Sequence, residues 1–485
     1  MLHILYIASE CAPYAKSGGL GDVLGALPKY VAREGIRTSV IVPLYRQIDE
    51  TSRKKMTFLG AKVIPLSWRK QYAGLYRLYV NDVTYYFVDN RYYFDRDALY
   101  GAYDDGERFA FFAKAVLDLL PMLDFFPDVL HCNDWQTAMV PVYFKVAHQR
   151  LADYRSLRTV FTIHNIEYQG KFNHGMLHDV LGLSEMHRNL MDLDGNLNYM
   201  KGAVVCCDAL TTVSPTYAQE IRHPFFGLGL DPVIREHAAK LHGILNGIDI
   251  EGYDPGTDPY LTANYGPETA ALKQSNKKKL SEDLGLEFSD SRPLIGMVTR
   301  LVHHKGPDLV MSVLDDMMKL DLNVVMLGTG DENYEFRFRQ AASRHPGRFA
   351  YVAAFSDSLA SRIYASADFF LMPSISEPCG LSQMIALRYG TIPIVRRTGG
   401  LRDTVHPFSP ETGQGNGITF ETINAHDMLD AIQRALSYYN DLSLRKQMTV
   451  NAFASDHGWD RSAKEYIALY RQISGRISAT QEGSE

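Results

Sequence analysis

At 485 residues the chain is too long for a single compact core, so its length predicts two domains. Hydrophobic residues make up 46% of the sequence and charged residues 22%, proportions typical of a water-soluble enzyme. The formal net charge of −6 argues against the basic surface of a nucleic-acid-binding protein, and no stretch is long and apolar enough to cross a membrane. We therefore expect neither nucleic acid nor a membrane as a partner.

The cysteines and the start of the chain both bear on location. The cysteines are few, odd in number and not at the spacings of metal ligands: Cys11, Cys132, Cys206, Cys207 and Cys379. This pattern is typical of a reducing compartment and predicts a cytoplasmic protein. The apolar segment Leu2–Ala8 is short and follows no basic residues, so we interpret it as a first strand and not as a signal peptide.

Strand-like and helix-like segments alternate along almost the whole chain. In the first half, short apolar runs predict strands at Leu2–Ala8, Arg37–Val42, Thr84–Val88, Asp128–His131, Arg158–Ile163, Ala209–Val213 and Leu241–Leu245. In the second half, they predict strands at Pro293–Thr299, Asn323–Leu327, Arg348–Ala353, Asp368–Met372, Ile392–Arg396 and Gly417–Phe420. Such runs are typical of strands buried on both faces of a parallel sheet, so we expect an α/β fold with two doubly wound domains.

The domain boundary is expected at the turn-rich sequence Asn246-Gly247-Ile248-Asp249. We assign residues 1–245 to an N-terminal domain and residues 246–455 to a C-terminal domain. Residues 456–475 have apolar side chains at helical spacing over Trp459–Ile473, and residues 476–485 form a polar tail. Further helices are predicted at Pro307–Leu320 and at the charged segment Lys273–Leu284.

A glycine-rich loop, Lys16-Ser17-Gly18-Gly19-Leu20, follows the first strand and precedes a helix that Gly35 can end. Pro28 lies inside this helix and is expected to kink it or to cost one backbone hydrogen bond. Glycines at a helix N-terminus let backbone N–H groups approach an anion. Because Lys16 adds a cation, we favour a phosphate-binding loop over a simple tight turn. The loop is neither a Walker A motif nor a Rossmann Gly-x-Gly-x-x-Gly, which argues against an NTPase and a dehydrogenase.

A second loop of this kind, Glu377-Pro378-Cys379-Gly380-Leu381, lies between a strand and a helix of the second half. Glu377 can accept hydrogen bonds from sugar hydroxyls; the alternative is that it caps the following helix. Arg300 and Lys305, after the first strand of this half, are spaced to converge on a diphosphate, unless both are solvated on a loop. With one such loop in each half, we expect a phosphorylated ligand to be held between the two domains.

Polar residues also follow two further strands of the first half, as Asp134-Trp135 and as His164-Asn165. Polar groups at one edge of a sheet indicate a polar substrate, and Trp135, Tyr168 and Phe172 offer rings that can stack on a sugar. Core packing explains these rings at least as well. For His164, a turn histidine bonded to the backbone is as good an explanation as a ligand contact.

The ordered set of motifs resembles bacterial glycogen synthase and plant starch synthase, from the first strand to about Tyr470. The motifs that carry the resemblance are Lys16-Ser17-Gly18-Gly19-Leu20-Gly21-Asp22-Val23, His164-Asn165 with Tyr168-Gln169-Gly170, Asn246-Gly247-Ile248-Asp249, Arg300 with Lys305, and Glu377-Pro378-Cys379-Gly380-Leu381. The resemblance implies a GT-B fold, in which two Rossmann-like domains face each other across a cleft and the last helix crosses back onto the N-terminal domain. It also implies a retaining enzyme that transfers glucose from ADP-glucose to the non-reducing 4-hydroxyl of an α-1,4-glucan such as glycogen.

The resemblance also implies roles for single residues. Arg300 and Lys305 would hold the diphosphate of ADP-glucose, Glu377 would bind the glucose hydroxyls, and His164 would position the glucose. Further residues assigned to the donor are Lys16, Gly18, Gly19, Asp22, Asn165, Asn246, Phe355, Cys379, Gly380 and Leu381. The residues assigned to the acceptor side are Glu10, Asp134, Trp135 and Tyr168.

Two positions depart from the family pattern. Gln136 stands where a histidine is common, and Phe355 stands where an aromatic hydroxyl often stacks on adenine. Neither change removes a charge from the predicted diphosphate site.

No metal or cofactor is expected, because two cations and helix-terminal N–H groups would stabilise the leaving diphosphate. We favour a front-face mechanism, in which the departing phosphate takes the acceptor proton, over a double displacement, for which the sequence singles out no nucleophile. Two other functions stay open: a GT-B enzyme that uses UDP-glucose or a small acceptor, and a non-catalytic glucan- or nucleotide-binding protein. Nothing in the sequence predicts an oligomeric state.

Overall fold

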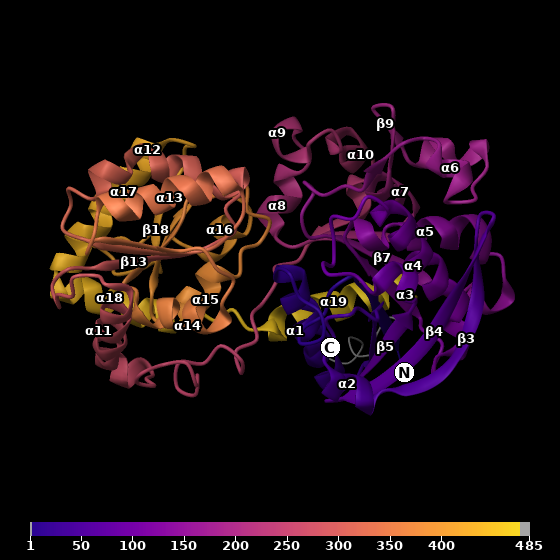
Figure 1. The fold of residues 1–485 in the computed structure, drawn as a ribbon, viewed down its shortest axis with the longest axis horizontal. Coiled ribbons are helices and arrows are strands. Elements are labelled where there is room, and N and C mark those ends of the chain that lie inside the picture. The colour runs from indigo at the N-terminus through magenta and orange to yellow at the C-terminus, as the bar shows by residue number, and fades with distance from the viewer. Residues whose placement is uncertain (1, 476–485) are drawn as a thin grey trace, which may run out of the picture. The chain divides into compact units, whose positions relative to one another are not determined.

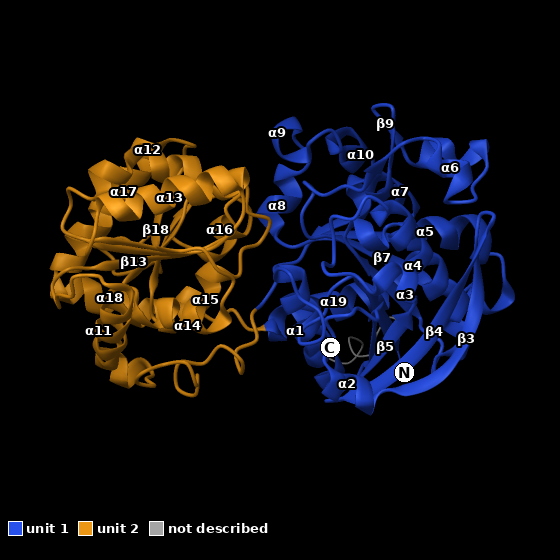
Figure 2. Ribbon diagram, in the orientation of Figure 1, with its two compact units in different colours: residues 1–247, 459–485 blue, residues 248–458 orange. Residues whose placement is uncertain are grey.

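The computed structural model describes residues 2–475, so the predicted polar tail 476–485 lies outside the described residues. The chain forms two compact units: unit 1 consists of residues 1–247 and 459–485, and unit 2 of residues 248–458 (Figure 2). Both crossings between the units lie slightly C-terminal to the expected boundaries. As a result, Asn246 belongs to unit 1, whereas the sequence placed it at the start of the second domain.

Unit 1 is built on one large sheet with the strand order β12-β11-β7-β6-β1-β2-β5-β4-β3. Figure 1 labels β7, β5, β4 and β3 of this sheet. Its strands are β1 (His3–Ile7), β2 (Arg37–Pro43), β3 (Thr57–Leu66), β4 (Arg69–Val80), β5 (Val83–Asp89), β6 (Val129–Asn133), β7 (Arg158–Ile163), β11 (Ala209–Thr212) and β12 (Leu241–Gly243). The strands from β12 to β5 pair in parallel, as predicted, and every one of them was predicted. The strand order reverses between β1 and β6, which defines the switch point of this sheet.

The sequence did not predict the antiparallel hairpin of β3 and β4 at the edge of this sheet. The hairpin keeps Val63, Tyr72 and Tyr79 exposed, and polar residues alternate with these apolar ones. A continuous apolar run is therefore missing, and the prediction of a purely parallel sheet was wrong at this edge. A second, small antiparallel sheet consists of β8 (Lys171–Phe172), β10 (Asn196–Asn198) and β9 (Asp192–Leu193).

The helices of unit 1 pack against this sheet around one large core. They are α1 (Gly19–Arg33), α2 (Glu50–Lys55), α3 (Arg91–Phe94), α4 (Asp105–Leu119), α5 (Met139–Tyr143), α6 (Met176–Asp179), α7 (Tyr199–Cys206), α8 (Pro215–Glu220), α9 (Pro224–Gly227), α10 (Asp231–Glu236) and α19 (Trp459–Ile473). Within α1, Pro28 has no N–H to give to the Leu24 carbonyl one turn earlier. The Cys11 thiol donates to the Leu24 carbonyl instead, at 3.2 Å. Burial raises the pKa of this thiol to about 12, so the thiol keeps the proton that it donates.

The last helix, α19, completes the core of unit 1 beside α1. Its Tyr470 hydroxyl donates to the Tyr6 hydroxyl at 3.0 Å and is hydrogen-bonded to His131 Nδ1 at 2.7 Å. Desolvation lowers the pKa of His131 to about 3, so the imidazole is neutral in the folded protein. Residues near the end of the chain are thus tied to β1 and β6.

Unit 2 contains a six-stranded sheet in the order β15-β14-β13-β16-β17-β18, with every pair parallel. Its strands are β13 (Leu294–Val298), β14 (Asn323–Leu327), β15 (Phe349–Val352), β16 (Phe369–Met372), β17 (Ile392–Arg396) and β18 (Ile418–Phe420). One face carries α12 (Pro307–Met317), α13 (Glu332–Arg344) and α17 (Ala425–Asn440), and the other carries α11 (Lys273–Leu284), α14 (Asp357–Ser366) and α15 (Ser382–Arg388) (Figure 1). The unit also contains α16 (Gly399–Thr404) and α18 (Leu442–Phe453).

The order in unit 2 is the dinucleotide-binding order, with the switch point between β13 and β16. In open parallel sheets, ligands bind at the carboxyl ends of the strands next to such a point. Each unit therefore presents one candidate site: after β1 and β6 in unit 1, and after β13 and β16 in unit 2. Over the described residues, no helix is long and apolar enough to cross a membrane.

Candidate active site

At the switch point of unit 2, an ion pair joins the segments that follow β13 and β16. Lys305 Nζ donates to both carboxylate oxygens of Glu377 at 2.7 Å, and the Ser374 hydroxyl donates to Glu377 Oε2 at 2.9 Å. Desolvation by itself raises the pKa of Glu377, but Lys305 and Ser374 outweigh it and hold this pKa below its ordinary value. Glu377 is therefore a buried carboxylate at neutral pH. Because its oxygens are bonded to Lys305 and Ser374, it does not cap α15.

Two glycines let the backbone of α16 approach the Glu377 loop closely. The Gly400 N–H donates to the Glu377 carbonyl at 3.1 Å. A Cβ atom on Gly399 would lie 1.9 Å from that carbonyl oxygen, and a Cβ atom on Gly400 would lie 2.1 Å from the Cys379 oxygen. Because no side chain fits at either position, the loop that carries Glu377 rests directly on the start of α16.

Arg300 and Phe355 lie at the carboxyl ends of β13 and β15 with their side chains exposed. The Arg300 guanidinium makes no hydrogen bond or ion pair with any residue in 2–475, whereas Lys305 is engaged by Glu377. The two cations that the sequence paired thus have different surroundings. The Phe355 ring is 70% exposed and remains accessible to a planar base.

In unit 1, a carboxylate already occupies N–H groups of the glycine-rich loop. Glu10 Oε2 accepts the N–H groups of Ser17 at 2.6 Å and Gly18 at 3.1 Å, and Oε1 accepts the Ser17 hydroxyl at 2.7 Å. The N–H groups of Ser17 and Gly18 thus bond a carboxylate, and that carboxylate is a side chain of the same chain. Lys16 is paired as well, since its Nζ lies 2.8 Å from Asp22 Oδ1 in the first turn of α1.

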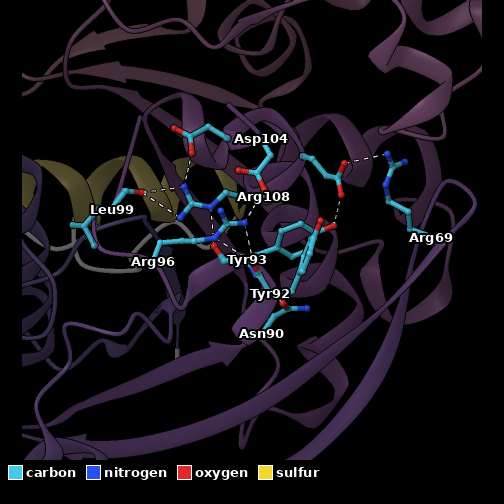
Figure 3. A network of polar contacts seen from close by, with 10 residues as sticks. Arg69, Asn90, Tyr92, Tyr93, Arg96, Leu99, Asp104 and Arg108 are labelled. Atoms are coloured by element: carbon cyan, nitrogen blue, oxygen red, sulfur yellow. Dashed lines mark hydrogen bonds and ion pairs between the residues drawn. The ribbon is translucent and has the colours of Figure 1, made fainter. Parts of the chain in front are cut away.

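A network of polar contacts around the fully buried Arg108 anchors Leu99, the residue before Tyr100 (Figure 3). The Tyr100 hydroxyl donates to Glu10 Oε1 at 2.7 Å. The preceding residue, Leu99, accepts two N–H groups of the fully buried Arg108 at 3.4 Å, and Arg108 also donates to the Tyr93 carbonyl at 2.8 Å. No motif in the sequence indicated Tyr100 or Arg108, because their role depends on contacts that only the fold creates.

The ends of β6 and β7 meet at Asp134. Asp134 Oδ1 accepts the His164 N–H at 2.7 Å and the Asn165 N–H at 3.4 Å. Its backbone has φ +58° and ψ 177°, a region that costs a non-glycine residue of order 1–3 kcal/mol. Desolvation raises the pKa of Asp134 to about 7 and lowers that of His164 to about 3. Because the His164 ring is bonded to Asn133 Oδ1 at 2.9 Å, it is not a turn histidine bonded to the backbone.

The aromatic candidates of unit 1 differ from one another. Trp135 packs against Phe109 and Phe172, with ring centroids 5.3 Å and 5.7 Å away, so core packing describes it better than an open stacking platform. Tyr168 is 44% exposed and can still meet a sugar. Asn246 is buried, and its Oδ1 has no hydrogen-bond partner among residues 2–475.

The chain is similar to known glycosyltransferases over nearly its whole length. Residues 3–236 match the family described as starch synthase catalytic domain, and residues 280–454 match glycosyl transferases group 1. Proteins named glycogen synthase are 50% identical in Geobacillus thermodenitrificans and 47% identical in Alkaliphilus metalliredigens; each alignment covers 97% of this chain, with 98% and 100% of the relative. The chain belongs to the glycogen and starch synthase family.

A solved structure agrees with this assignment. The catalytic domain of starch synthase IV from Arabidopsis thaliana, bound to ADP and acarbose, is 34% identical with a TM-score of 0.92, covering 98% of this chain and 100% of that one. A sucrose-phosphate synthase from Thermosynechococcus elongatus is 16% identical with a TM-score of 0.63, which shows a shared fold alone. The predicted GT-B fold is confirmed.

For this member of the glycogen and starch synthase family, many of the predicted site residues follow strands at or next to the two switch points, whereas Phe355 follows β15 and Asn246 follows β12, both at sheet edges away from these points. In unit 2, the structure brings Lys305 and Glu377 into contact and places Cys379, Gly380 and Leu381 in the same loop. In unit 1, the Glu10 carboxylate accepts the Gly18 N–H, and the Asp134 carboxylate accepts the His164 N–H. Among the described residues, no three His, Cys, Asp or Glu side chains are arranged to hold a metal ion.

Proposed function

We propose that this protein is a glycogen synthase that transfers glucose from ADP-glucose to the non-reducing 4-hydroxyl of an α-1,4-glucan, with retention at the anomeric carbon. The observation that carries the proposal is the buried Lys305–Glu377 pair at the switch point of a dinucleotide-binding sheet, in a chain 50% identical to proteins named glycogen synthase. The starch synthase that matches with a TM-score of 0.92 was bound to ADP and to acarbose. This supports ADP as the nucleotide of the sugar donor and a glucan as the acceptor.

The leaving group of this reaction is a nucleoside diphosphate, so the site must stabilise developing negative charge. A lysine ammonium has three N–H donors, and Glu377 takes two of them, which leaves one for a phosphate oxygen. Arg300 adds an exposed guanidinium whose donors are not used by any described residue. In the proposal, Lys305 and Arg300 hold the diphosphate, and Glu377 accepts hydrogen bonds from the glucose hydroxyls.

Unit 1 supplies the remaining groups of the proposed mechanism. A phosphate at the glycine-rich loop would have to displace Glu10 from Gly18, and Lys16 would have to leave Asp22. His164, whose ring is neutral, would position the glucose without adding charge. The departing phosphate would take the acceptor proton on the same face of the sugar, and closure around the donor would exclude water.

The test is to mix the protein with ADP-glucose or UDP-glucose, with and without glycogen, and to measure which nucleotide is released. We expect ADP release that depends on glycogen, and a product whose new linkage is α by NMR. Release of UDP alone, or transfer to a small acceptor alone, would favour a different GT-B enzyme. Binding of ADP and glycogen without release would identify a non-catalytic binding protein.

A metal-free reaction in the cytoplasm is part of the same proposal. All five cysteines are free and buried, which is typical of a reducing compartment. We expect glucose transfer to be unchanged after dialysis against EDTA; a loss that added Mg²⁺ or Mn²⁺ restores would show that a cation takes part.

A further inference from the structure

A side-chain amide from α15 ties together the loop that carries Glu377 and the start of the next helix. Gln383 is fully buried in the first turn of α15. Its Nε2 lies 3.0 Å from the Cys379 carbonyl oxygen, 2.8 Å from the Gly380 carbonyl oxygen and 3.0 Å from Thr404 Oγ1. One amide group thus joins two backbone carbonyls of the loop to a side chain of α16.

The surrounding hydrogen bonds fix which way this amide points. The Thr404 hydroxyl donates its proton to the Gly400 carbonyl at 2.6 Å, so its oxygen can only accept from Gln383. The amide nitrogen must therefore face Thr404 and the loop. The amide oxygen lies against Gly380, where a Cβ atom would be 2.4 Å from it, and Gly380 has φ +74°. Both the backbone angle and the amide thus require glycine at position 380.

The direction of the two carbonyls determines the direction of two N–H groups. In a trans peptide the C=O and N–H bonds point to opposite sides, and both peptides here are trans. Because the Cys379 and Gly380 carbonyls turn toward Gln383, the N–H groups of Gly380 and Leu381 turn away from it. No residue in 2–475 accepts a hydrogen bond from either N–H group.

We propose that Gln383 is a positioning residue, which aims the N–H groups of Gly380 and Leu381 at the phosphate oxygens of the donor. The inference rests on the proposed function, since it assumes that a nucleoside diphosphate occupies this switch point. Two neighbouring N–H donors can both bond phosphate oxygens only if their two peptides keep the orientation that the Gln383 amide gives them. Thr404 supports the same orientation from α16.

Gln383→Met tests this role, because methionine fills a similar volume and lacks both N–H donors. We expect ADP to bind at least tenfold more weakly to Gln383→Met, and the KM for ADP-glucose to rise at least tenfold, while the KM for glycogen stays the same. Thr404→Val, which removes the hydroxyl that holds the amide, should weaken ADP binding about threefold. Thr404→Ser keeps the hydroxyl and should bind ADP as the wild type does.

Asn451→Leu is a matched control elsewhere in unit 2. Asn451 Nδ2 also bonds two backbone carbonyls, those of Gly413 at 2.8 Å and Gly415 at 2.7 Å, in a loop that leads into the opposite end of the sheet, before β18. Its loss should lower the melting temperature without changing the affinity for ADP. This control separates a general loss of stability from a change in the orientation of the Gly380 and Leu381 N–H groups.

The experiment measures ADP binding by calorimetry together with nucleotide release by the wild type. If the wild type releases ADP and Gln383→Met binds ADP normally, the positioning role is refuted and the proposed function stands. If the wild type releases UDP instead, the donor assignment is wrong, and the same comparison with UDP decides the role of Gln383. If the wild type binds neither nucleotide, both the function and the positioning role are refuted.

Discussion

The contact between Lys305 and Glu377 predicts that removing one partner is more damaging than removing both. The two side chains are 17% and 6% exposed, so Lys305→Met leaves an almost buried carboxylate with only Ser374 as a partner. Breaking a buried pair in this way costs about 3–5 kcal/mol. For a unit of this size, each kcal/mol lowers the melting temperature by about 2–4 °C, so we expect a fall of about 10 °C.

The double variant Lys305→Met/Glu377→Gln removes the unpaired charge and should recover most of this loss. Neither variant should transfer glucose at more than about a thousandth of the wild-type rate, because both lack the cation proposed to face the leaving group. Thermal unfolding and urea titration at pH 7 measure the stability, and ADP release measures the activity. A double variant that is no more stable than Lys305→Met would show that Lys305 does not compensate the burial of the Glu377 carboxylate.

The pH dependence provides an independent check on the same pair. In the wild type, the folded-state pKa of Glu377 lies below its unfolded value. Its contribution to stability is therefore present above the unfolded pKa and is lost as the pH falls through the folded pKa. In Lys305→Met, desolvation should raise the folded pKa instead, so the stability deficit should shrink as the pH falls from 7 toward 5. A deficit that stays constant over this range would contradict the assigned cause.

Three further changes test other parts of the structure. Arg300→Ala should lower the rate of glucose transfer by several orders of magnitude. The melting temperature should not change, because the Arg300 guanidinium bonds no described residue. Near-normal transfer would exclude Arg300 from the leaving-group site. Gly399→Ala should lower the free energy of unfolding in urea by over 3 kcal/mol, because its Cβ atom would lie 1.9 Å from the Glu377 carbonyl oxygen. Gly35→Ala is the control: Gly35 also has a positive φ but lies in open space, so this change should cost about 1 kcal/mol. Equal losses would argue against the close approach of Gly399 to the Glu377 loop. Burial lowers the pKa of His131 to about 3, so as the pH falls the unfolded chain takes up this proton before the folded protein does. This histidine alone should lower the free energy of unfolding by about 2 kcal/mol from pH 6.5 to 5. In urea titrations His131→Asn should therefore lose less stability over this range than the wild type, and an equal loss would contradict the burial of a neutral imidazole.

Much of the fold could be predicted from the sequence, because a parallel sheet has a simple signature. Strands buried on both faces need continuous apolar runs, and all the parallel strands of the two large sheets were predicted from such runs. The helices Lys273–Leu284 and Trp459–Ile473 have the predicted bounds. The β3–β4 hairpin has one partly exposed face, and its mixed pattern of Tyr72, Tyr79 and polar residues does not distinguish a strand from a loop.

The site could be predicted only as a set of positions. The sequence indicated that Lys16, Gly18 and Glu377 follow strands, because a strand–loop–helix pattern is local. It did not indicate that Glu10 would occupy the Gly18 N–H group or that Lys16 would pair with Asp22. A charged side chain in a sequence has many possible partners, and packing selects one of them. Gln383 was missed for the same reason, since a buried amide has no sequence pattern of its own.

The contribution of α19 to unit 1 has a consequence for how the protein is made. Tyr470 is 339 positions after its partner His131, and all of residues 248–458 are translated between the two parts of unit 1. At roughly 5–20 residues per second, the ribosome needs roughly 10–40 s to synthesise that stretch. During this time the nascent chain lacks the helix that covers Tyr6 and His131. Unit 2, which is continuous in sequence, can therefore finish folding first, and a message cut short before codon 459 would yield an N-terminal half with its core left open.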